Sequence, residues 1–304
     1  MAMTFLKKQS ASAPSKSLKY LLHNYLSGPD DGRPFAVIHA SDLTKEEGLC
    51  PRAYALADVT KAKPHGSWLV TSEVVMYRMG HDQQDAVVNW FADMGRAIGH
   101  WQCLACNHLH EFQKRPQKCV ACDALAFRPK EVRFTSAING ASCGIDMLAA
   151  LGDTKLVPVE IKTMAAEQFK GLLAPLAEHR LRTNLYLRII RESAHSWSDQ
   201  VNTSKAIVLY IQKGGYGCAD PQLKTWGLHE QFSPFKDYEI KRIDSETDVL
   251  AARAKVVTDF RAGNVGMPVG LCSTAMSKRA STCQFKTKCF AGDHPPVHDW
   301  KAST

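Results

Sequence analysis

Several features that mark well-known protein classes are absent from this chain of 304 residues. No apolar run approaches the roughly 20 residues that span a bilayer, and the N-terminus lacks the apolar segment of a signal peptide. The chain has neither a G-x-x-x-x-G-K-[ST] loop nor a G-x-G-x-x-G turn, and it shows no internal repeat. We therefore expect a soluble, cytoplasmic protein that is neither a P-loop nor a dinucleotide-binding protein.

The composition fits a globular protein with a mild preference for polyanions. Hydrophobic residues make up 45% of the chain, enough for a full core, and the formal net charge is +8. A basic surplus of this size favours partners such as nucleic acid without requiring them. Ten cysteines in a chain without an export signal indicate metal binding rather than disulfides. Eight of them form two sets of four, which leaves Cys143 and Cys218 unassigned.

Two short segments, residues 144–148 and 159–163, have the apolar pattern of strands and are joined by turn residues. They predict a β-hairpin. Glu160 and Lys162 are two residues apart and therefore project from the same face of their strand, while Asp146 can reach that face from the partner strand. Two carboxylates and one ammonium group then converge.

Such a trio has a direct chemical use. Carboxylates are hard oxygen ligands for Mg²⁺ or Mn²⁺, and a lysine can orient an attacking water or stabilise developing charge. A surface salt bridge on an amphipathic hairpin is the alternative. Glu160 and Lys162 lie in an otherwise apolar run, where charge is unfavourable unless it is used. The sequence therefore favours a functional site.

G-x-D followed by a turn and then Val159-Glu160-Ile161-Lys162-Thr163 resembles the PD-(D/E)XK nuclease superfamily, in its RecB-like branch. The resemblance implies an α/β (α+β) fold, in which a central mixed sheet is flanked by helices. It also implies that Asp146 and Glu160 are metal ligands and that Lys162 is the catalytic lysine. Strands are further expected at 131–134 and 137–138, just before the hairpin.

Cys50-Pro51-Arg52-Ala53-Tyr54 resembles the first cluster cysteine of iron–sulfur nucleases in the same branch, which includes CRISPR-adaptation nucleases and the AddB subunit. The resemblance implies a C-terminal group of three cysteines, and Cys272, Cys283 and Cys289 supply it. A [4Fe–4S] cluster would then join the two ends of the chain. Zinc on the same four thiolates, or free thiols, are the alternatives.

A second cysteine set has the most regular spacing in the chain. Cys103-Leu104-Ala105-Cys106 and Cys119-Val120-Ala121-Cys122 are two CxxC knuckles separated by twelve residues. This pattern predicts a tetrahedral Zn²⁺ ribbon, inserted at residues 100–128. His108 and His110 lie between the knuckles and are not expected to be ligands. The ribbon is structural in one interpretation and grips DNA through its basic residues in another.

Residues 72–92 have the apolar spacing of a long helix. RecB-like nucleases carry a metal-contacting histidine four residues after a glycine of this helix. Here Gly80 is followed by His81 and, at the family distance, by Gln84. Either side chain could contact the metal by this resemblance, and a solvated or packing role is the alternative.

A basic helix is predicted at residues 175–193. The family's Q-x-x-x-Y signature falls here, with arginine in place of glutamine. His179, Arg182 and Tyr186 lie along one helical face and could hold a DNA phosphate. An ordinary solvated basic face is the alternative.

Composition and spacing divide the chain into consecutive segments. They are a flexible arm (1–16), an N-terminal helical part with the first cluster cysteine (17–99), the ribbon (100–128), the nuclease core (129–262) and the cysteine-cluster segment (263–304). Within the second segment, residues 17–26 predict a short packed helix.

The predicted function is a metal-dependent DNA exonuclease of phage or bacterial recombination, replication or repair. Its substrate would be single-stranded DNA or duplex ends, and a recombination or single-strand-binding protein is an expected partner. A non-catalytic zinc or iron–sulfur nucleic-acid-binding protein is the alternative. A regulator that senses redox state through the cluster is a third hypothesis.

Overall fold

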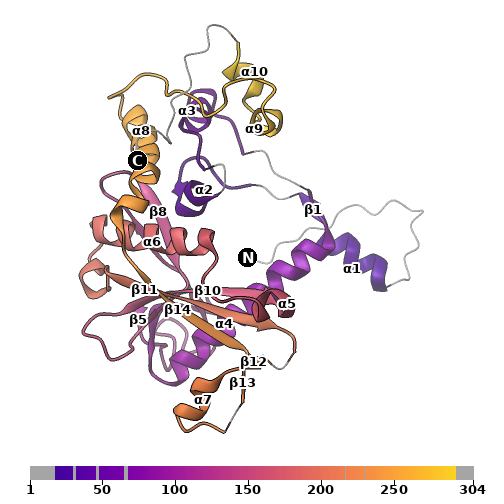
Figure 1. Cartoon of the computed structure of the whole chain (residues 1–304), viewed down its shortest axis with the longest axis vertical. Helices are drawn as coiled ribbons and strands as arrows, with labels where there is room; N and C mark the ends of the chain where they lie inside the picture. Colours follow the sequence, from indigo (N-terminus) through magenta and orange to yellow (C-terminus); the bar gives the residue numbers. More distant parts are fainter. Residues whose placement is uncertain are drawn as a thin grey trace. The chain divides into compact units, whose positions relative to one another are not determined.

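The computed structural model describes residues 18–29, 32–45, 48–64, 68–215, 217–229 and 231–291. The arm expected at 1–16 lies outside these residues. The elements follow one another as α1 (Leu18–Leu26), β1 (Gly28–Pro29), β2 (Ile38–His39), α2 (Ala40–Thr44), α3 (Pro51–Thr60), β3 (Trp68–Leu69), α4 (Thr71–Asp93), β4 (Ala97–Cys103), β5 (Leu109–Gln113), β6 (Phe127–Lys130), β7 (Val132–Thr135), β8 (Ala141–Ile145), β9 (Met147–Ala149), β10 (Val157–Ala165), α5 (Ala166–Lys170), α6 (Ala177–Glu192), η1 (Ser198–Gln200), β11 (Lys205–Lys213), β12 (Cys218–Ala219), α7 (Pro221–Thr225), β13 (Phe232–Ser233), β14 (Phe235–Lys241), η2 (Asp244–Glu246), α8 (Asp248–Arg261), α9 (Lys278–Thr282) and α10 (Lys286–Cys289) (Figure 1).

The described residues divide into two compact units. One takes those within Met1–Arg33 and Pro64–Met79, and the other takes those within Pro34–Lys63 and Gly80–Thr304. In the first unit, α1 forms where its apolar spacing predicts a helix, but none of its residues is buried. The expectation of a packed helix is therefore wrong, because periodic spacing creates an apolar face without specifying what covers it. No helix among the described residues is long and apolar enough to cross a membrane.

A mixed sheet forms the centre of the second unit. Its strands run in the order β14, β11, β10, β9, β4, β5, and β6 pairs with β4. β10 pairs antiparallel with β9 and parallel with β11, and every other ladder of this sheet is antiparallel. β9 and β10 form the predicted hairpin, but its expected first strand, 144–148, is divided, because Gly144 and Ile145 belong to β8 and pair with β7 in another sheet. Helices flank the central sheet, so the expected mixed α/β class is confirmed.

Side-chain alternation along β10 gives the sheet two different faces. On one face, Val159 and Ile161 pack with Val87 and Val88 of α4. On the other, Met164 packs with Tyr210 of β11, and α6 lies over this side. Residues at even positions of β10 therefore point toward α6, away from α4.

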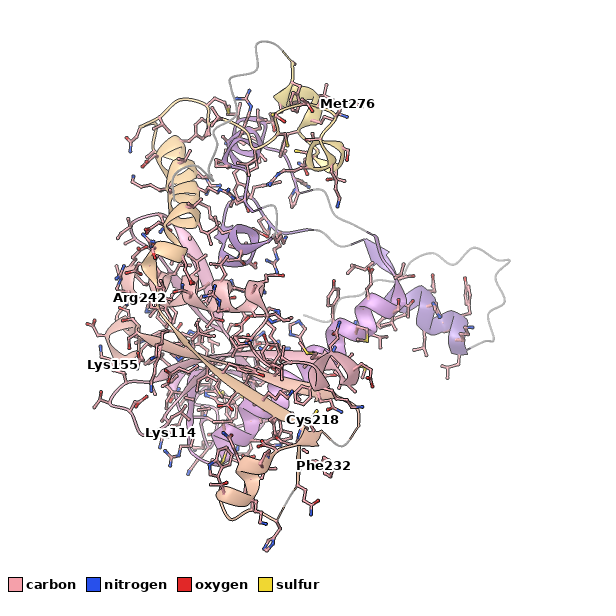
Figure 2. The ribbon with its side chains drawn as sticks, viewed as in Figure 1. Lys114, Lys155, Cys218, Phe232, Arg242 and Met276 are labelled. Atoms are coloured by element: carbon pink, nitrogen blue, oxygen red, sulfur yellow. The ribbon has the colours of Figure 1, made fainter. Side chains whose placement is uncertain are left out.

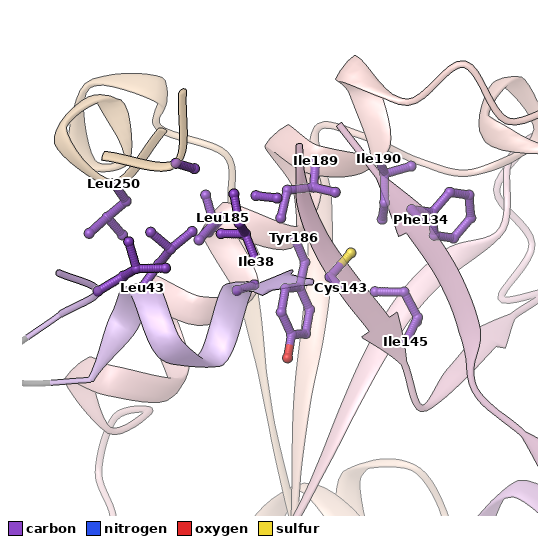
Figure 3. Packing of buried hydrophobic residues seen from close by; sticks show 14 of the residues in the cluster. Ile38, Leu43, Phe134, Cys143, Ile145, Leu185, Tyr186, Ile189, Ile190 and Leu250 are labelled. Atoms are coloured by element: carbon purple, nitrogen blue, oxygen red, sulfur yellow. The ribbon is translucent and has the colours of Figure 1, made fainter. Parts of the chain in front are cut away.

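A smaller sheet, in the order β2, β8, β7, adjoins the central one. Its inward residues, with those of α6, build the largest buried cluster, where Tyr186 packs beside Cys143 and Ile145 (Figure 3). The strand expected at 137–138 is a turn instead. The Ser136 hydroxyl accepts the backbone N–H groups of Ile138 and Asn139, and β8 begins only at Ala141. Local side-chain hydrogen bonds of this kind compete with a strand ladder.

Candidate active site

Glu160 and Lys162 form an ion pair on the face of β10 that is turned toward α6. Glu160 is 4% exposed, Lys162 is 24% exposed, and Lys162 Nζ lies 2.5 Å from Glu160 Oε1. Asp146 joins them through the backbone, because its Oδ2 accepts the Ile161 N–H at 2.8 Å. The structure therefore brings the three predicted residues together.

The position of Asp146 follows from how the chain changes sheets. β8 ends at Ile145 in the smaller sheet, and β9 begins at Met147 in the central one. Asp146 is the single residue between them, so its carboxylate is free to accept a backbone donor of β10. The position of the Asp146 carboxylate is thus set by the point at which the chain passes from one sheet to the other.

The electrostatics of the trio are unbalanced toward negative charge. Burial, and then the Glu160 carboxylate, raise the pKa of Asp146 well above its usual value, and Glu131 adds a smaller contribution. Burial lowers the pKa of Lys162, but the Glu160 and Asp146 carboxylates outweigh it and hold this pKa above the usual value. One ammonium group faces two half-buried or buried carboxylates, an arrangement that a cation can complete.

Three residues of α6, His179, Arg182 and Tyr186, were predicted to contact DNA. Their side chains differ in their hydrogen-bond partners and in their burial. His179 Nδ1 lies 2.9 Å from the Tyr210 hydroxyl, which accepts the Leu176 N–H. Burial, followed by the charges of Lys162 and Arg182, lowers the pKa of His179 to about 4. His179 is therefore neutral near pH 7, and it can donate one hydrogen bond but offers no positive charge.

Arg182 and Tyr186 differ in how open they are. Arg182 forms an ion pair with Glu178, and its Nε donates to the Thr44 hydroxyl at 3.3 Å. The Tyr186 ring belongs to the buried cluster, and its hydroxyl points out of that cluster in Figure 3. Burial, and then the Glu160 charge, raise the pKa of Tyr186 well above its usual value. The Tyr186 hydroxyl is thus close enough to Glu160 and Asp146 for their charges to act on it.

His81 and Gln84 are not part of the trio's hydrogen bonds or ion pairs among the residues that the structure describes. His81 is exposed, Gln84 is half-buried, and α4 packs on the opposite face of β10 from Glu160. The nearest link is Gly80, where an added Cβ would lie 3.3 Å from the Thr163 hydroxyl. The glycine thus permits a close approach of α4 to β10 just past Lys162.

The predicted ribbon cysteines converge on one point. Cys103 Sγ lies 3.6 Å from Cys122 Sγ, and Cys106 Sγ lies 3.6 Å from Cys119 Sγ. All four sulfurs lie within 4.8 Å of one another. Backbone hydrogen bonds, that of Cys106 first, lower the pKa of Cys103 to about 7, which favours the thiolate that a metal binds. This group can hold a metal ion.

The ribbon is continuous with the central sheet. β4 pairs with β9 through Ala97 and Ile98 and with β5 and β6 further along. His110 is buried, its Nε2 has no partner among the described residues, and burial lowers its pKa. It lies outside the four-sulfur group. Lys114, on the loop that follows β5, is labelled at the edge of the molecule in Figure 2.

The other four cysteines line a single cavity. Cys50 precedes α3, Cys272, Cys283 and Cys289 come from the C-terminal segment, and Gly270 also lines the cavity. Among the described residues, only the ribbon cysteines have all four sulfur atoms close enough together to bind a single ion. The late set is therefore gathered around a wider space. Of the two unassigned cysteines, Cys143 is in the main buried cluster and Cys218 lies on β12, beside β13 with Phe232 (Figure 2).

Two residues near the trio were not predicted. Tyr210 holds His179, and Glu131 lies next to Gly144, where an added Cβ would be 2.2 Å from Glu131 Oε2. Neither residue belongs to a sequence motif that would have pointed to it. Their roles depend on strand pairing, which is set by β7 pairing with β8 and β10 with β11.

No protein-family model matches the chain, and no curated protein matches it. Solved structures resemble it in part. The crystal structure of SSO0001 is 16% identical over 90% of this chain and 93% of that chain, with a TM-score of 0.36. The alkaline exonuclease LHK-Exo from Laribacter hongkongensis, also solved in complex with dAMP, is 11% identical over 76% of this chain and 90% of that chain, with a TM-score of 0.40. Likeness at this level does not assign a function, which has to come from the chain's own side chains.

Proposed function

We propose that the chain is a metal-dependent DNA nuclease of the PD-(D/E)XK type, in the RecB-like branch. The observation that carries this proposal is the buried Glu160, ion-paired with Lys162 and adjoined by Asp146 through the Ile161 N–H. Replacing a buried ion pair with apolar residues is often neutral or stabilising, so stability does not explain why this strand carries one. A catalytic role accounts for it.

Asp146 and Glu160 would hold Mg²⁺ or Mn²⁺, because their combined charge exceeds that of Lys162 and their oxygens are hard ligands. When bound, such an ion polarises the scissile phosphodiester and lowers the pKa of water. Lys162 would orient the attacking water, and Glu160 holds the lysine in place for this task. His81 and Gln84 are proposed as additional contacts from α4, supported by the family resemblance and by the Gly80 approach.

α6 would meet the DNA strand. Arg182 is the cationic candidate, and a phosphate would take the place of Glu178 in its ion pair. His179 would donate a neutral hydrogen bond, with its orientation set by Tyr210. Tyr186 would present its hydroxyl beside the carboxylates. These three separate roles are supported by the different burial and charge of the three side chains.

The ribbon would bind Zn²⁺. Four Zn–S bonds of about 2.3 Å in a tetrahedron place the sulfurs about 3.8 Å apart, close to the 3.6 Å separations observed. The late cysteines would bind a [4Fe–4S] cluster, for which thiolates around a wider cavity are suitable ligands. Zinc in the late site remains the alternative to be tested.

An exonuclease that acts on single strands or duplex ends, in phage or bacterial recombination, replication or repair, is the proposed biological form of this activity. It is supported by the resemblance in motif order, from Cys50 through the trio to Cys289. A recombination or single-strand-binding protein is the proposed partner. A non-catalytic binding protein is the alternative. It is favoured by Gln84 in place of the family's helix histidine, by Arg182 in place of the motif glutamine, and by the absence of α4 contacts with the trio among the described residues.

End-labelled linear single-stranded and duplex DNA, incubated with Mg²⁺ or Mn²⁺, tests the activity. Wild type is expected to degrade the DNA, while Asp146→Ala and Lys162→Ala lose at least about 100-fold in rate. Lys162→Ala should retain DNA affinity. The position of the label gives the polarity of digestion. If all three proteins leave both substrates intact, the nuclease proposal fails and the binding-protein alternative stands.

A further inference from the structure

Lys162, Tyr210 and Lys236 form a row across three strands of the central sheet. Lys162 of β10 is directly opposite Tyr210 of β11, and Tyr210 is opposite Lys236 of β14. Directly opposed residues of neighbouring strands project to the same face of a sheet. This is the face on which Tyr210 packs with Met164 and over which α6 lies. A side chain of α6 that is held by Tyr210 is therefore held next to Lys162.

The connection between α5 and α6 is tied down on the same face. Lys236 Nζ and the Tyr238 hydroxyl both donate to the Leu172 carbonyl, each at 2.9 Å. Lys236 also donates to the last two carbonyls of α5. The Tyr210 hydroxyl accepts the Leu176 N–H at 3.0 Å, directly before α6 begins. The start of α6 is thus fixed over β11 by side chains of the sheet.

The hydrogen bonds of the Tyr210 hydroxyl determine which nitrogen of His179 carries the proton. Tyr210 is fully buried, so its hydroxyl hydrogen needs an acceptor within the protein. The Leu176 N–H can only donate, and among the described residues the other partner of the hydroxyl is His179 Nδ1, at 2.9 Å. Nδ1 therefore accepts, and a neutral imidazole that accepts at Nδ1 carries its hydrogen on Nε2.

Nε2 is the nitrogen of His179 that is left for a ligand. The residue is half-buried, and in the part of the chain that the structure describes Nε2 has no hydrogen-bond partner without being one of the buried unpartnered atoms, so a ligand can reach it. Burial, followed by the charges of Lys162 and Arg182, lowers the pKa of His179 to about 4, so the ring keeps this single donor near pH 7. An anionic oxygen attracted to Lys162 would meet the Nε2–H group beside it.

We infer that Tyr210 is a positioning residue of the site: its hydroxyl holds His179 in the Nε2–H form, and Nε2–H donates to a non-bridging oxygen of the scissile phosphodiester beside Lys162. The inference rests on the proposed function, because it takes DNA as the ligand that reaches the trio. Tyr210 acts through His179 and does not itself contact DNA. His179 is then a hydrogen-bond donor and not the general base, since its accepting nitrogen is already occupied by Tyr210.

Histidine ¹⁵N NMR at neutral pH tests the protonation of His179 without any need for catalysis. The His179 signals are identified by their loss in His179→Gln, and the wild type is expected to show Nε2 protonated and Nδ1 unprotonated. Tyr210→Phe is expected to show a mixture of the two neutral forms. A wild-type ring that is protonated at Nδ1 overturns the inference, whether or not the variant folds.

Tyr238→Phe is the matched control. It removes a hydroxyl from the same face and from the same α5–α6 connection, and its ring neighbours that of Tyr210 at 5.9 Å. It should leave His179 in the Nε2–H form. In cleavage assays Tyr210→Phe is expected to lower kcat about tenfold, because a misplaced donor no longer meets the phosphate. It should have no further effect in a His179→Gln background, since it acts through that ring.

The phosphate contact is tested with the Lys162→Ala protein, so that the DNA strand stays intact. Adding a short single-stranded oligonucleotide is expected to shift the Nε2 signal of His179. The inference is overturned if this signal does not move, or if Tyr210→Phe and Tyr238→Phe slow cleavage equally. If the wild type cuts no DNA, the nuclease proposal fails, while the protonation of His179 and its response to DNA still decide this inference.

Discussion

The Asp146 carboxylate lies half-buried between β8 and β9, beside Glu160. Because burial and Glu160 raise its pKa in the folded state, the folded protein holds this proton more tightly than the unfolded chain does. The free energy of unfolding therefore falls as the pH rises from the ordinary carboxyl pKa through the raised one, and the loss is complete above it. An asparagine keeps the acceptor for the Ile161 N–H and removes the charge.

Asp146→Asn is accordingly expected to stabilise the metal-free protein at neutral pH by on the order of 1 kcal/mol, or roughly 2–4 °C in Tm. Thermal unfolding at several pH values checks this, and the advantage should shrink toward acid pH, where the wild-type carboxyl is protonated. Added Mg²⁺ should raise the Tm of the wild type but not of the variant. Asp199→Asn, at an exposed site, is the control. A variant less stable than wild type at neutral pH contradicts the prediction.

The residues that could be predicted from the sequence are those whose chemistry conflicts with their surroundings. Glu160 and Lys162 are charges inside an apolar strand, and the structure brings them together with Asp146. Glu131 carries no such conflict, because it precedes a strand and is exposed. Its position over Gly144, two residues before Asp146, follows from the pairing of β7 with β8, which the strand expected at 137–138 did not predict.

Elements were predicted well where periodicity is long and poorly where tertiary contacts decide. α4 and α6 form close to their expected limits, because many turns of apolar spacing define them. The orientation of α4 could not be predicted, since its face toward β10 carries Val87 and Val88 and leaves His81 exposed. The ribbon was predictable from spacing alone, but its continuity with the central sheet through β4 was not.

Although the ribbon continues from the central sheet through β4, we expect its folding to depend on its metal and the folding of the rest of the sheet not to. Cys106→Ser is expected to release the ribbon metal and to speed amide hydrogen exchange about tenfold or more across residues 103–128, because the bound ion contributes folding energy there. β10 keeps its ladders with β9 and β11 and should be unaffected. Metal analysis and exchange mass spectrometry measure both effects.

His110→Gln is the control for the ribbon, because His110 lies outside the four-sulfur group and its loss should leave the metal content unchanged. The ribbon also contacts the rest of the molecule through a side chain, because the ring of Phe112 on β5 stacks on Trp197, just before η1, with ring centroids 4.7 Å apart. If exchange rises throughout the molecule in Cys106→Ser, the ribbon is an integral part of the core and the prediction is wrong.

At the scale of the second unit, the late cysteines join segments that are far apart in sequence. Phe285 packs with Leu56 and Ala57 of α3, and Arg52 donates to the Pro268 carbonyl at 3.2 Å. Arg279 donates to the Gly48 carbonyl at 2.6 Å. α10 thus packs against α3 and against α9 (Figure 1), and a cluster on Cys50, Cys272, Cys283 and Cys289 would fasten these segments together. A cross-link that closes a loop of this length contributes up to about 5 kcal/mol in chain-entropy terms.

Cys272→Ser is therefore expected to lose the metal of this site and to lower the Tm by on the order of 10 °C, with faster amide exchange in α3, α9 and α10. Iron and acid-labile sulfide in anaerobically purified wild type identify a [4Fe–4S] cluster, whereas a colourless protein with about two zinc ions per chain identifies zinc in both cysteine sites. Cys218→Ser, remote from the cavity that the late cysteines line, should change neither metal content nor Tm. A Cys272→Ser protein with wild-type metal content and Tm would show that packing against α3 alone holds the C-terminal segment in place.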